Sequence, residues 1–377
     1  MVGELLAKGF RPDVDRCIHL SGIIDQEAIT RLIPRIVQLR LESSDPITLF
    51  IDSNGGAVLD ADILYDLVSQ SDLDNQKCQL ITVAVRRAQS AAAFLLARGA
   101  YAVAYPTAVI HFHGLRHQAA VVTTEKAAEL SAALQSHNDS YALTLARSVI
   151  GRFFWLILTF QTELPKIESP DFISGLSKWL EGKLSKPNAN LVKRAYAKWQ
   201  EAEELSSYVF KKIRLKKNPT NGEMDVAVLK MILDYEVKTK PKNWEITPEG
   251  FDQIKRDFYQ FHDYHWGVHK AAFSDRAMPL LRLLLPPEKL QELYAIPEAD
   301  LKGREVFLKG NVEPFALPIW YFILSLCRLL YEGENPLRVD EAYWLGLVDE
   351  VMGSDLPCMR VLHEEAGKQK AADQSQS

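Results

Sequence analysis

The stretch RRAQSAAAFLLARG, residues 86–99, places the hydroxyl of Ser90 among small and apolar side chains, where an apolar run gives way to a helical pattern. A serine at the start of a helix can be an N-cap, because its oxygen accepts a hydrogen bond from a free amide of the first turn. The same place suits a nucleophile, because the helix dipole and free amides stabilise a developing oxyanion. The local sequence leaves both interpretations open.

Two histidines follow in YPTAVIHFHG, residues 105–114. His111 and His113 are two residues apart, so on a strand they share one face. A serine nucleophile needs a base within hydrogen-bond reach, and histidine is the usual one. For each histidine taken separately, a buried structural role is the alternative.

A third motif, IDSNGGAV at residues 51–58, ends an apolar run in two glycines. Gly55 and Gly56 permit unusual backbone dihedrals and leave amide groups exposed. If the run is a strand of a parallel sheet, these amides lie at its carboxyl edge, where α/β proteins place their sites.

The elements that must position these residues follow from hydrophobic patterning. Short apolar runs predict strands, and three- to four-residue spacing of apolar side chains predicts helices between them. The predicted strands are 17–22, 47–52, 80–85 and 107–114, and the predicted helices are 25–43, 58–71 and 124–149. In the second helix the apolar side is expected to consist of Leu59, Ile63, Leu64 and Leu67. Alternation of strand and helix predicts an α/β protein with a parallel sheet.

Taken together, these motifs resemble the proteolytic subunit of the Clp protease family, serine peptidases of the ClpP/crotonase fold. The family has I-N-S-P-G-G where this chain has IDSNGG, and A-A-S-M-G-A-F-L-L where it has AQSAAAFLL. Near its end the family has E-A-x-x-Y-G-L-I-D, matched here by EAYWLGLVD. The resemblance covers about residues 16–149 and 336–352. It implies an α/β core of repeated β-β-α and βαβ units, interrupted by a large, mostly helical insertion.

The resemblance also implies roles for individual residues. Ser90 falls on the nucleophile, and His113, seven residues after the motif proline, falls on the base; His111 is the second choice. The amides of Gly56 and Ala91 fall on the oxyanion hole. The implied reaction is hydrolysis of peptide bonds by a Ser–His mechanism.

Two departures from the family pattern bear on activity. Arg86 and Arg87 replace a small G-Q pair before the nucleophile, which changes the wall of the substrate groove. Reading back from LGLVD places the acid of the family on Leu330, and only Glu332 and Glu334 are near. Either a glutamate substitutes, or the protein uses a Ser–His dyad, or it is a catalytically silent subunit or scaffold. A crotonase-type acyl-CoA enzyme, which shares the paired-amide oxyanion hole, is a further alternative.

Composition narrows the class of protein. The chain has 377 residues and a net charge of −5, which argues against a nucleic-acid-binding function. Four cysteines without C-x-x-C spacing favour a reducing compartment, and the expected location is cytoplasmic. The apolar runs at 153–160 and 315–327 are shorter than a membrane span and are expected to be buried core helices, so no membrane association is expected. No cofactor is expected.

We expect four regions: a first part of the core at 1–150, a helical insertion at 151–330, a C-terminal part of the core at 331–355, and a disordered tail at 356–377. The resemblance implies polypeptide substrates, assembly into a homo- or hetero-oligomer, and a possible AAA+ unfoldase partner. Within the insertion, the basic run 211–217 is expected to be a solvated face. His262, His265 and His269 have the spacing of one helix face and could bind zinc, but an aromatic-rich core helix is preferred.

Overall fold

The computed structural model describes residues 12–71, 77–116, 123–212, 283–297 and 299–358, with isolated residues at 230–232, 235, 239 and 280. The strands are β1 (Cys17–Ile24), β2 (Ile47–Gly56), β3 (Leu80–Gln89), β4 (Tyr101–Ala104), β5 (Val109–His113), β6 (Glu334–Leu337) and β7 (Glu350–Val351). The helices are α2 (Gln26–Glu42), α3 (Val58–Ser69), α4 (Ala91–Arg98), α5 (Thr124–Thr159), α6 (Phe172–Lys183), α7 (Lys186–Lys212), α12 (Pro287–Ala295), α13 (Leu301–Asn311), α14 (Glu313–Leu330) and α15 (Val339–Trp344).

The strands form one seven-stranded sheet in the order β1-β2-β3-β4-β7, with β5 paired to β3 and β6 paired to β5. All pairings are parallel except that of β5 with β6. The central strands are apolar along most of their length because parallel strands are usually buried on both faces. The predicted α/β class with a parallel sheet is confirmed.

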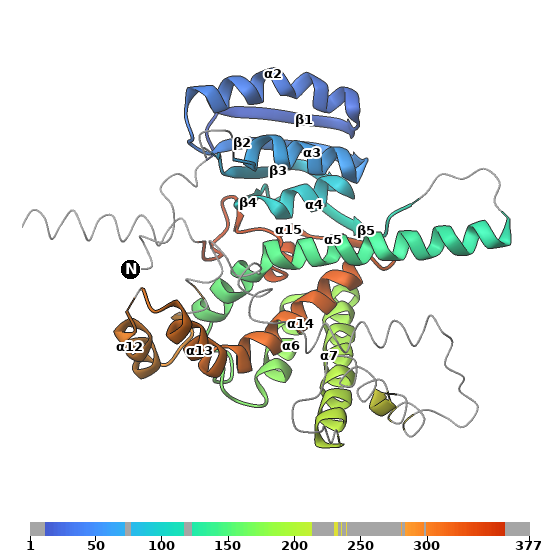
Figure 1. Cartoon of the computed structure of the whole chain (residues 1–377). Coiled ribbons are helices and arrows are strands. Elements are labelled where there is room, and N and C mark those ends of the chain that lie inside the picture. The colour runs from blue at the N-terminus through green and yellow to red at the C-terminus, as the bar shows by residue number, and fades with distance from the viewer. Residues whose placement is uncertain are drawn as a thin grey trace, which may run out of the picture.

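Helices α2, α3 and α4 lie along one face of the sheet (Figure 1). Helix α2 begins where the side chain of Asp25 accepts a hydrogen bond from the amide of Ala28. On the opposite face, β1 exposes alternate residues, among them His19, Ser21 and Ile23. The sheet therefore has an open face along β1 and β2, as judged from the described part of the chain.

The buried side of α3 differs from the predicted one. Leu64 is buried as expected, but Leu59 and Ile63 are 67% and 41% exposed. Ala61 and Val68 complete the buried side instead. The prediction was wrong at Leu59 and Ile63, because periodicity gives the spacing of a face and not which face meets the core.

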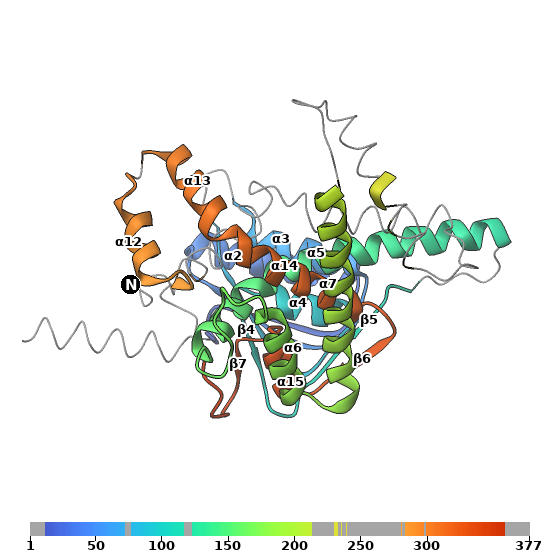
Figure 2. The same cartoon turned by 90° about the horizontal axis from the view of Figure 1, so that it is seen from below.

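Helix α5 is a single helix of 36 residues that continues past residue 150, the expected boundary of the insertion. Its N-terminal end extends beyond the sheet, at the opposite end of the molecule from α12 and α13 (Figures 1 and 2). Its segment Glu129–Thr159 is long and apolar enough to cross a membrane, yet 67% of the qualifying window is buried inside the protein. Phe153 and Phe154 lie in the core, as predicted for this run.

A buried ion pair joins α5 to both parts of the core. Arg152 donates from Nε to Oδ2 of Asp349 at 2.8 Å, and from its Nη atoms to the carbonyl oxygens of Ala97 and Gly99, each at 2.7 Å. Asp349 also accepts a hydrogen bond from the amide of Ala102. Arg152 thus holds the end of α4 and the loop before β7, and through Asp349 also the start of β4.

Helix α14 is largely buried, and it packs against α5 and α7. The predicted core run at 315–327 lies within it, and Ile319, Trp320 and Phe322 are fully buried. Pro318 lies inside the helix. The helices after residue 150 share one continuous hydrophobic cluster with the sheet.

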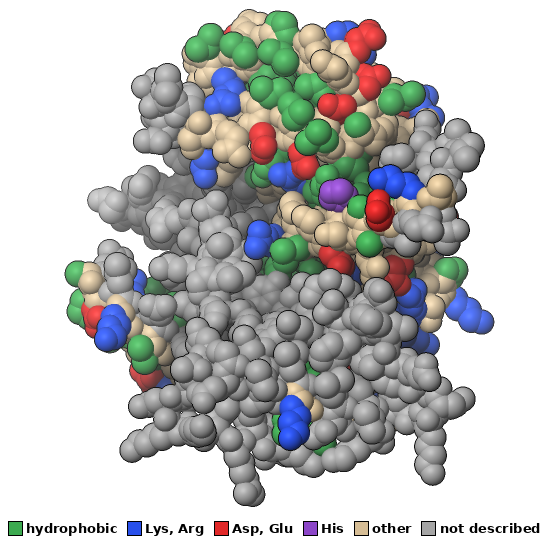
Figure 3. All heavy atoms as spheres, turned by 45° about the vertical axis from the view of Figure 1, so that its right-hand side comes forward, with side chains coloured by type: hydrophobic (Ala, Val, Ile, Leu, Met, Phe, Trp, Pro, Cys, Tyr) green, Lys and Arg blue, Asp and Glu red, His purple; other side chains and the backbone are tan. Residues whose placement is uncertain are grey.

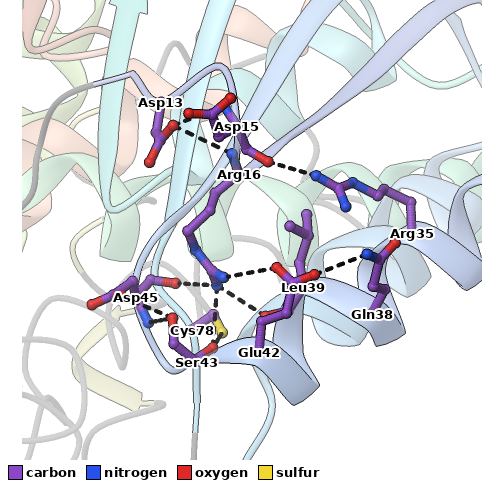
Figure 4. A network of polar contacts seen from close by, with 10 residues as sticks. All are labelled: Asp13, Asp15, Arg16, Arg35, Gln38, Leu39, Glu42, Ser43, Asp45 and Cys78. Carbon is purple, nitrogen blue, oxygen red and sulfur yellow. Dashed lines mark hydrogen bonds and ion pairs between the residues drawn. The ribbon is translucent and has the colours of Figure 1, made fainter.

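A second polar network fixes the chain before β1 to the end of α2 (Figure 4). Nη2 of Arg16 donates to the carbonyl oxygens of Leu39, Ser43 and Asp45, at 3.0, 3.1 and 3.1 Å. These carbonyls belong to the last turn of α2 and the loop after it, where a helix leaves carbonyl groups without partners. A cation there also interacts favourably with the helix dipole.

Candidate active site

Ser90 occupies the turn between β3 and α4, at the N-cap position of the helix. Its side chain makes no cap hydrogen bond, so the N-cap interpretation is wrong for this serine. Its backbone has φ 55° and ψ −123°, and Ser90 is the sole non-glycine residue with positive φ among those described. Residues other than glycine avoid this conformation, and holding one there costs about 1–3 kcal/mol.

A sharp strand-to-helix turn of this kind is how a nucleophile elbow exposes its serine at the top of a sheet. The turn is fixed by a hydrogen bond of 2.7 Å from the amide of Ser90 to the carbonyl of His111 on β5. The following residues, Ala91, Ala92 and Ala93, are buried and small. The strain is therefore local to the residue whose hydroxyl would react.

The glycine pair at the end of β2 lies against this turn. A Cβ atom on Gly55 would lie 2.5 Å from the carbonyl oxygen of Gln89 and 2.7 Å from Cβ of Ser90. A Cβ atom on Gly56 would lie 2.1 Å from the carbonyl oxygen of Ile24 on β1. Both positions thus require glycine, and both have positive φ.

This close approach brings the end of β2 beside Ser90 and the first amides of α4. The amide of Ala91 would lie 3.2 Å from a Cβ on Gly55. The first amides of a helix have no partner within the helix, so they are available to an oxyanion. The two segments that should form the predicted oxyanion hole, at Gly56 and Ala91, are therefore adjacent.

Both candidate histidines lie on β5 with half-buried side chains, and their ring centroids are 5.7 Å apart. His111 is the register partner of Gln89, the residue before Ser90. Alternation along β5 buries Ile110 and Phe112 and leaves the histidines on the other face. Among the described residues Ser90 Oγ has no hydrogen bond to either ring, which is compatible with a base whose bond tightens on binding substrate.

The two imidazoles have different partners. Nδ1 of His113 lies 2.7 Å from the carbonyl oxygen of Gly114. A carbonyl only accepts, so Nδ1 carries the proton in this bond and Nε2 is left as an acceptor. That tautomer is the one a general base needs.

His111 contacts a carboxylate. Its Nε2 is buried and lies 3.0 Å from Oε2 of Glu334, although the approach lacks the geometry of a hydrogen bond. Glu334 also pairs with Arg116, and on β6 it is the register partner of His113. The glutamate therefore lies beside both histidines.

The other acidic candidate lies elsewhere. Glu332 pairs with Arg194 and Lys198 of α7, so its carboxylate belongs to the contact between the helices and the core. Leu330, on which the ungapped reading placed the acid, is buried at the end of α14. Sequence spacing alone could not distinguish the two glutamates.

The two arginines before the nucleophile surround one carboxylate that sequence reasoning had missed. Arg86 donates to Oδ2 of Asp52 from Nε at 2.9 Å and Nη2 at 2.6 Å, and Nε of Arg87 donates to Oδ1 at 3.1 Å. The hydrogen bond from Arg86 is the main cause that holds the pKa of Asp52 below its ordinary value. The available signal was an aspartate at the end of one predicted strand, just before S-N-G-G, and an Arg-Arg pair just after the next predicted strand.

No group of three histidine, cysteine or acidic side chains with the arrangement of a metal site occurs among the described residues. His262, His265 and His269, and residues 213–217 of the basic run, lie outside the described part. So do residues 359–377 of the tail.

Comparison with known proteins identifies the part of the chain that carries this site. The model of the Clp protease family matches residues 12–141, which include β1 to β5 and α2 to α4. The match supports a ClpP-like family assignment for this part of the chain. No curated protein sequence is significantly similar to the chain.

The Clp protease match contains Ser90, both histidines and both glycines, and it ends within α5. At the level of the family it supports a peptidase with a ClpP-like α/β fold. Glu334, on β6, lies outside the matched residues and is brought to the site by the return of the chain after α14.

Proposed function

We propose that this protein is a serine endopeptidase of the Clp type, with Ser90 as its nucleophile. The observation that carries the proposal is the backbone of Ser90, held at φ 55° at the strand-to-helix turn with no cap hydrogen bond. A structural serine gains nothing from this strain, whereas a nucleophile gains an exposed hydroxyl beside helix amides.

In the proposed mechanism Oγ of Ser90 attacks the carbonyl carbon of the scissile peptide bond while Nε2 of His113 takes its proton. The amides of Gly56 and Ala91 stabilise the oxyanion of the tetrahedral intermediate. His113 then gives the proton to the leaving amine, and the C–N bond breaks. Water, deprotonated by the same histidine, hydrolyses the resulting acyl-enzyme.

The orienting group for the base is the carbonyl of Gly114, which fixes the tautomer of His113. Glu334 contributes negative charge beside the imidazolium that forms during the reaction. If His111 is the base instead, Glu334 is its partner and stands in for the missing aspartate. Glu332 has neither role, because it pairs with α7.

A catalytically silent subunit is the second candidate, and the absence of an aspartate at the acid position favours it. In that case the adjacent glycine turn and Ser90 would be remnants of a site. A crotonase-type acyl-CoA enzyme would need the paired amides but no strained serine, so the backbone of Ser90 argues against it.

Assembly into an oligomer and cooperation with an AAA+ unfoldase are part of the proposal, as is hydrolysis of polypeptides. Outward-facing apolar side chains on α2 and α3 support an oligomer, because contiguous exposed apolar side chains mark interaction surfaces. They are Ile33, Val37 and Leu41 on α2, and Leu59 and Ile63 on α3. The cytoplasmic location remains a proposal, supported by four free cysteines.

A fluorophosphonate probe tests the proposal directly, because it labels a serine that a base deprotonates and amides stabilise. We expect labelling of the intact protein, none in Ser90→Ala, and a loss of at least about tenfold in rate in His113→Ala. Ser21→Ala and His19→Ala, exposed on the open face of β1, are matched controls that should label normally.

Comparison of the labelling rates of the histidine and glutamate variants also shows which residue is the base and which is its partner. A larger loss in His111→Ala and Glu334→Gln than in His113→Ala would make His111–Glu334 the catalytic pair. Absence of labelling between about pH 6 and 9, a range that spans titration of an ordinary histidine, would favour the silent subunit. Co-purified coenzyme A detected by mass spectrometry would favour the acyl-CoA enzyme.

A further inference from the structure

The register of β2 and β3 changes just before the nucleophile. Ile51 pairs with Ala84 and Ser53 pairs with Ala88, so a single residue of β2, Asp52, faces three residues of β3. The three are Val85, Arg86 and Arg87. A bulge of this kind re-aims side chains and is common next to active sites. Here it turns two consecutive arginines toward one carboxylate.

The cluster keeps a net positive charge. Two guanidinium groups face one carboxylate, and Asp52 stays ionised because its hydrogen bond from Arg86 lowers its pKa. Each guanidinium has five N–H donors. Arg86 donates to Asp52 from two nitrogen atoms, Nε and Nη2, and Arg87 donates from one, Nε. The described residues offer these two side chains no other acceptor.

The cluster is accessible and lies on the face of the histidines. The side chains of Arg86 and Arg87 are 70% and 41% exposed, against 22% for Asp52. Arg87 pairs with Val109 and Gln89 pairs with His111, so Arg87 shares its sheet face with His111 and His113. Figure 3 shows basic and acidic side chains close together on one side of the molecule.

The spacing fits an extended peptide. Arg87 precedes Ser90 by three residues of strand, which is about 10 Å. A substrate strand with its scissile bond at Ser90 would therefore bring a side chain about three residues away to the arginines. A carboxylate in that place would accept the remaining guanidinium donors in a charge-assisted, bidentate contact.

We propose that Arg86 and Arg87, held by Asp52 on the bulge of β3, form a subsite that selects peptides with an acidic side chain about three residues from the cleaved bond. The proposal rests on the proposed peptidase function and names the substrate class of that same site. Asp52 is a positioning residue: its carboxylate accepts hydrogen bonds from both arginines and neutralises part of their positive charge.

The test uses quenched fluorescent peptides in which one glutamate is scanned over four positions on each side of the cleaved bond, each paired with its glutamine isostere. At low ionic strength we expect a kcat/KM ratio of Glu over Gln of about five or more at one or two adjacent positions, which falls as salt screens the contact. Arg87→Gln and Arg86→Gln should bring the ratio to about one. Asp52→Asn keeps a side-chain oxygen that accepts from the arginines but removes the competing negative charge, and so should raise the ratio. Arg31→Gln, exposed on α2 on the other side of the sheet, should change nothing.

Two outcomes overturn the inference, and they are distinguishable. Hydrolysis of the peptides at equal rates for Glu and Gln at all positions leaves a peptidase without this subsite. No hydrolysis of any peptide, together with no fluorophosphonate labelling, removes the peptidase function and this subsite with it.

Discussion

The guanidinium of Arg152 and the carboxylate of Asp349 are hydrogen-bonded at 2.8 Å in the core, although the two residues are 197 positions apart in the chain. This pair fastens the long helix α5 to the loop before β7. Removal of one partner of a buried ion pair leaves the other charge uncompensated and costs about 3–5 kcal/mol.

We therefore expect Arg152→Met to lower the free energy of unfolding by about 3–5 kcal/mol, measured by urea denaturation. Adding Asp349→Leu should cost less than the sum of the single changes, because it removes the stranded charge. Arg338→Met, whose ion pair with Asp340 is exposed, is the matched control and should cost less than about 1 kcal/mol. Equal losses in both arginine variants would contradict the structural role of Arg152.

Glu341 makes the stability of the contact between α7 and the core depend on pH, because its carboxylate accepts hydrogen bonds from Ser185 and Asn188. Burial raises the pKa of Glu341, but hydrogen bonds from Ser185, from the amide of Arg338 and from Asn188 outweigh it, and the net pKa lies below the ordinary 4.5. A carboxyl whose pKa is lower when folded stabilises the protein above its ordinary pKa, and this contribution is lost as pH falls through the folded value. Glu341→Gln should therefore destabilise the protein at pH 7 by about 1–3 kcal/mol and show a smaller loss of stability between pH 5 and 3. Thermal unfolding across this range is the measurement, and the exposed Glu129→Gln should keep the wild-type profile.

The capping of α2 by Arg16 can be tested at the level of one helix. Arg16→Met leaves the carbonyls of Leu39, Ser43 and Asp45 without their shared donor, and we expect a loss of about 1–3 kcal/mol. Amide hydrogen exchange should become faster at the C-terminal end of α2. Arg35→Met, which removes one contact with the carbonyl of Asp15 at an exposed position, should change exchange little.

Strain at Ser90 predicts an unusual order of stability. Glycine adopts positive φ without cost, so Ser90→Gly should be more stable than Ser90→Ala by about 1 kcal/mol. At Ser140, exposed within α5, the order should be reversed by about the same amount, because glycine disfavours a helix. Finding alanine better than glycine at both positions would show that Ser90 is unstrained. Both Ser90 variants should lose fluorophosphonate labelling.

The sequence was sufficient for four strands, β1, β2, β3 and β5, and for the order of the motifs; it did not predict β4, β6 or β7. The runs at 17–22, 47–52 and 80–85 became β1, β2 and β3, since a run of apolar β-formers between turn residues has few other ways to be buried. All three strands continue further than expected, to Ile24, Gly56 and Gln89, because pairing with neighbouring strands carries them past the predicted ends.

Other features could be decided only by tertiary structure. The exposure of Leu59 and Ile63 depends on which side of α3 meets the sheet, and periodicity does not contain that information. Glu334, and not Glu332, lies beside the histidines because β6 pairs with β5. More than 200 residues separate these two strands in the chain. Likewise, the ion pairs of Asp52 with Arg86 and Arg87 depend on the register shift between β2 and β3.

Ser90 shows the division most clearly. Its residue type and its place between a strand and a helix are written in the sequence, and they left a cap and a nucleophile equally open. The positive φ that separates the two is imposed by the hydrogen bond to His111 on β5 and by the close approach of Gly55 from β2. A backbone dihedral held against its local preference requires contacts from distant segments, so only the folded chain could determine it.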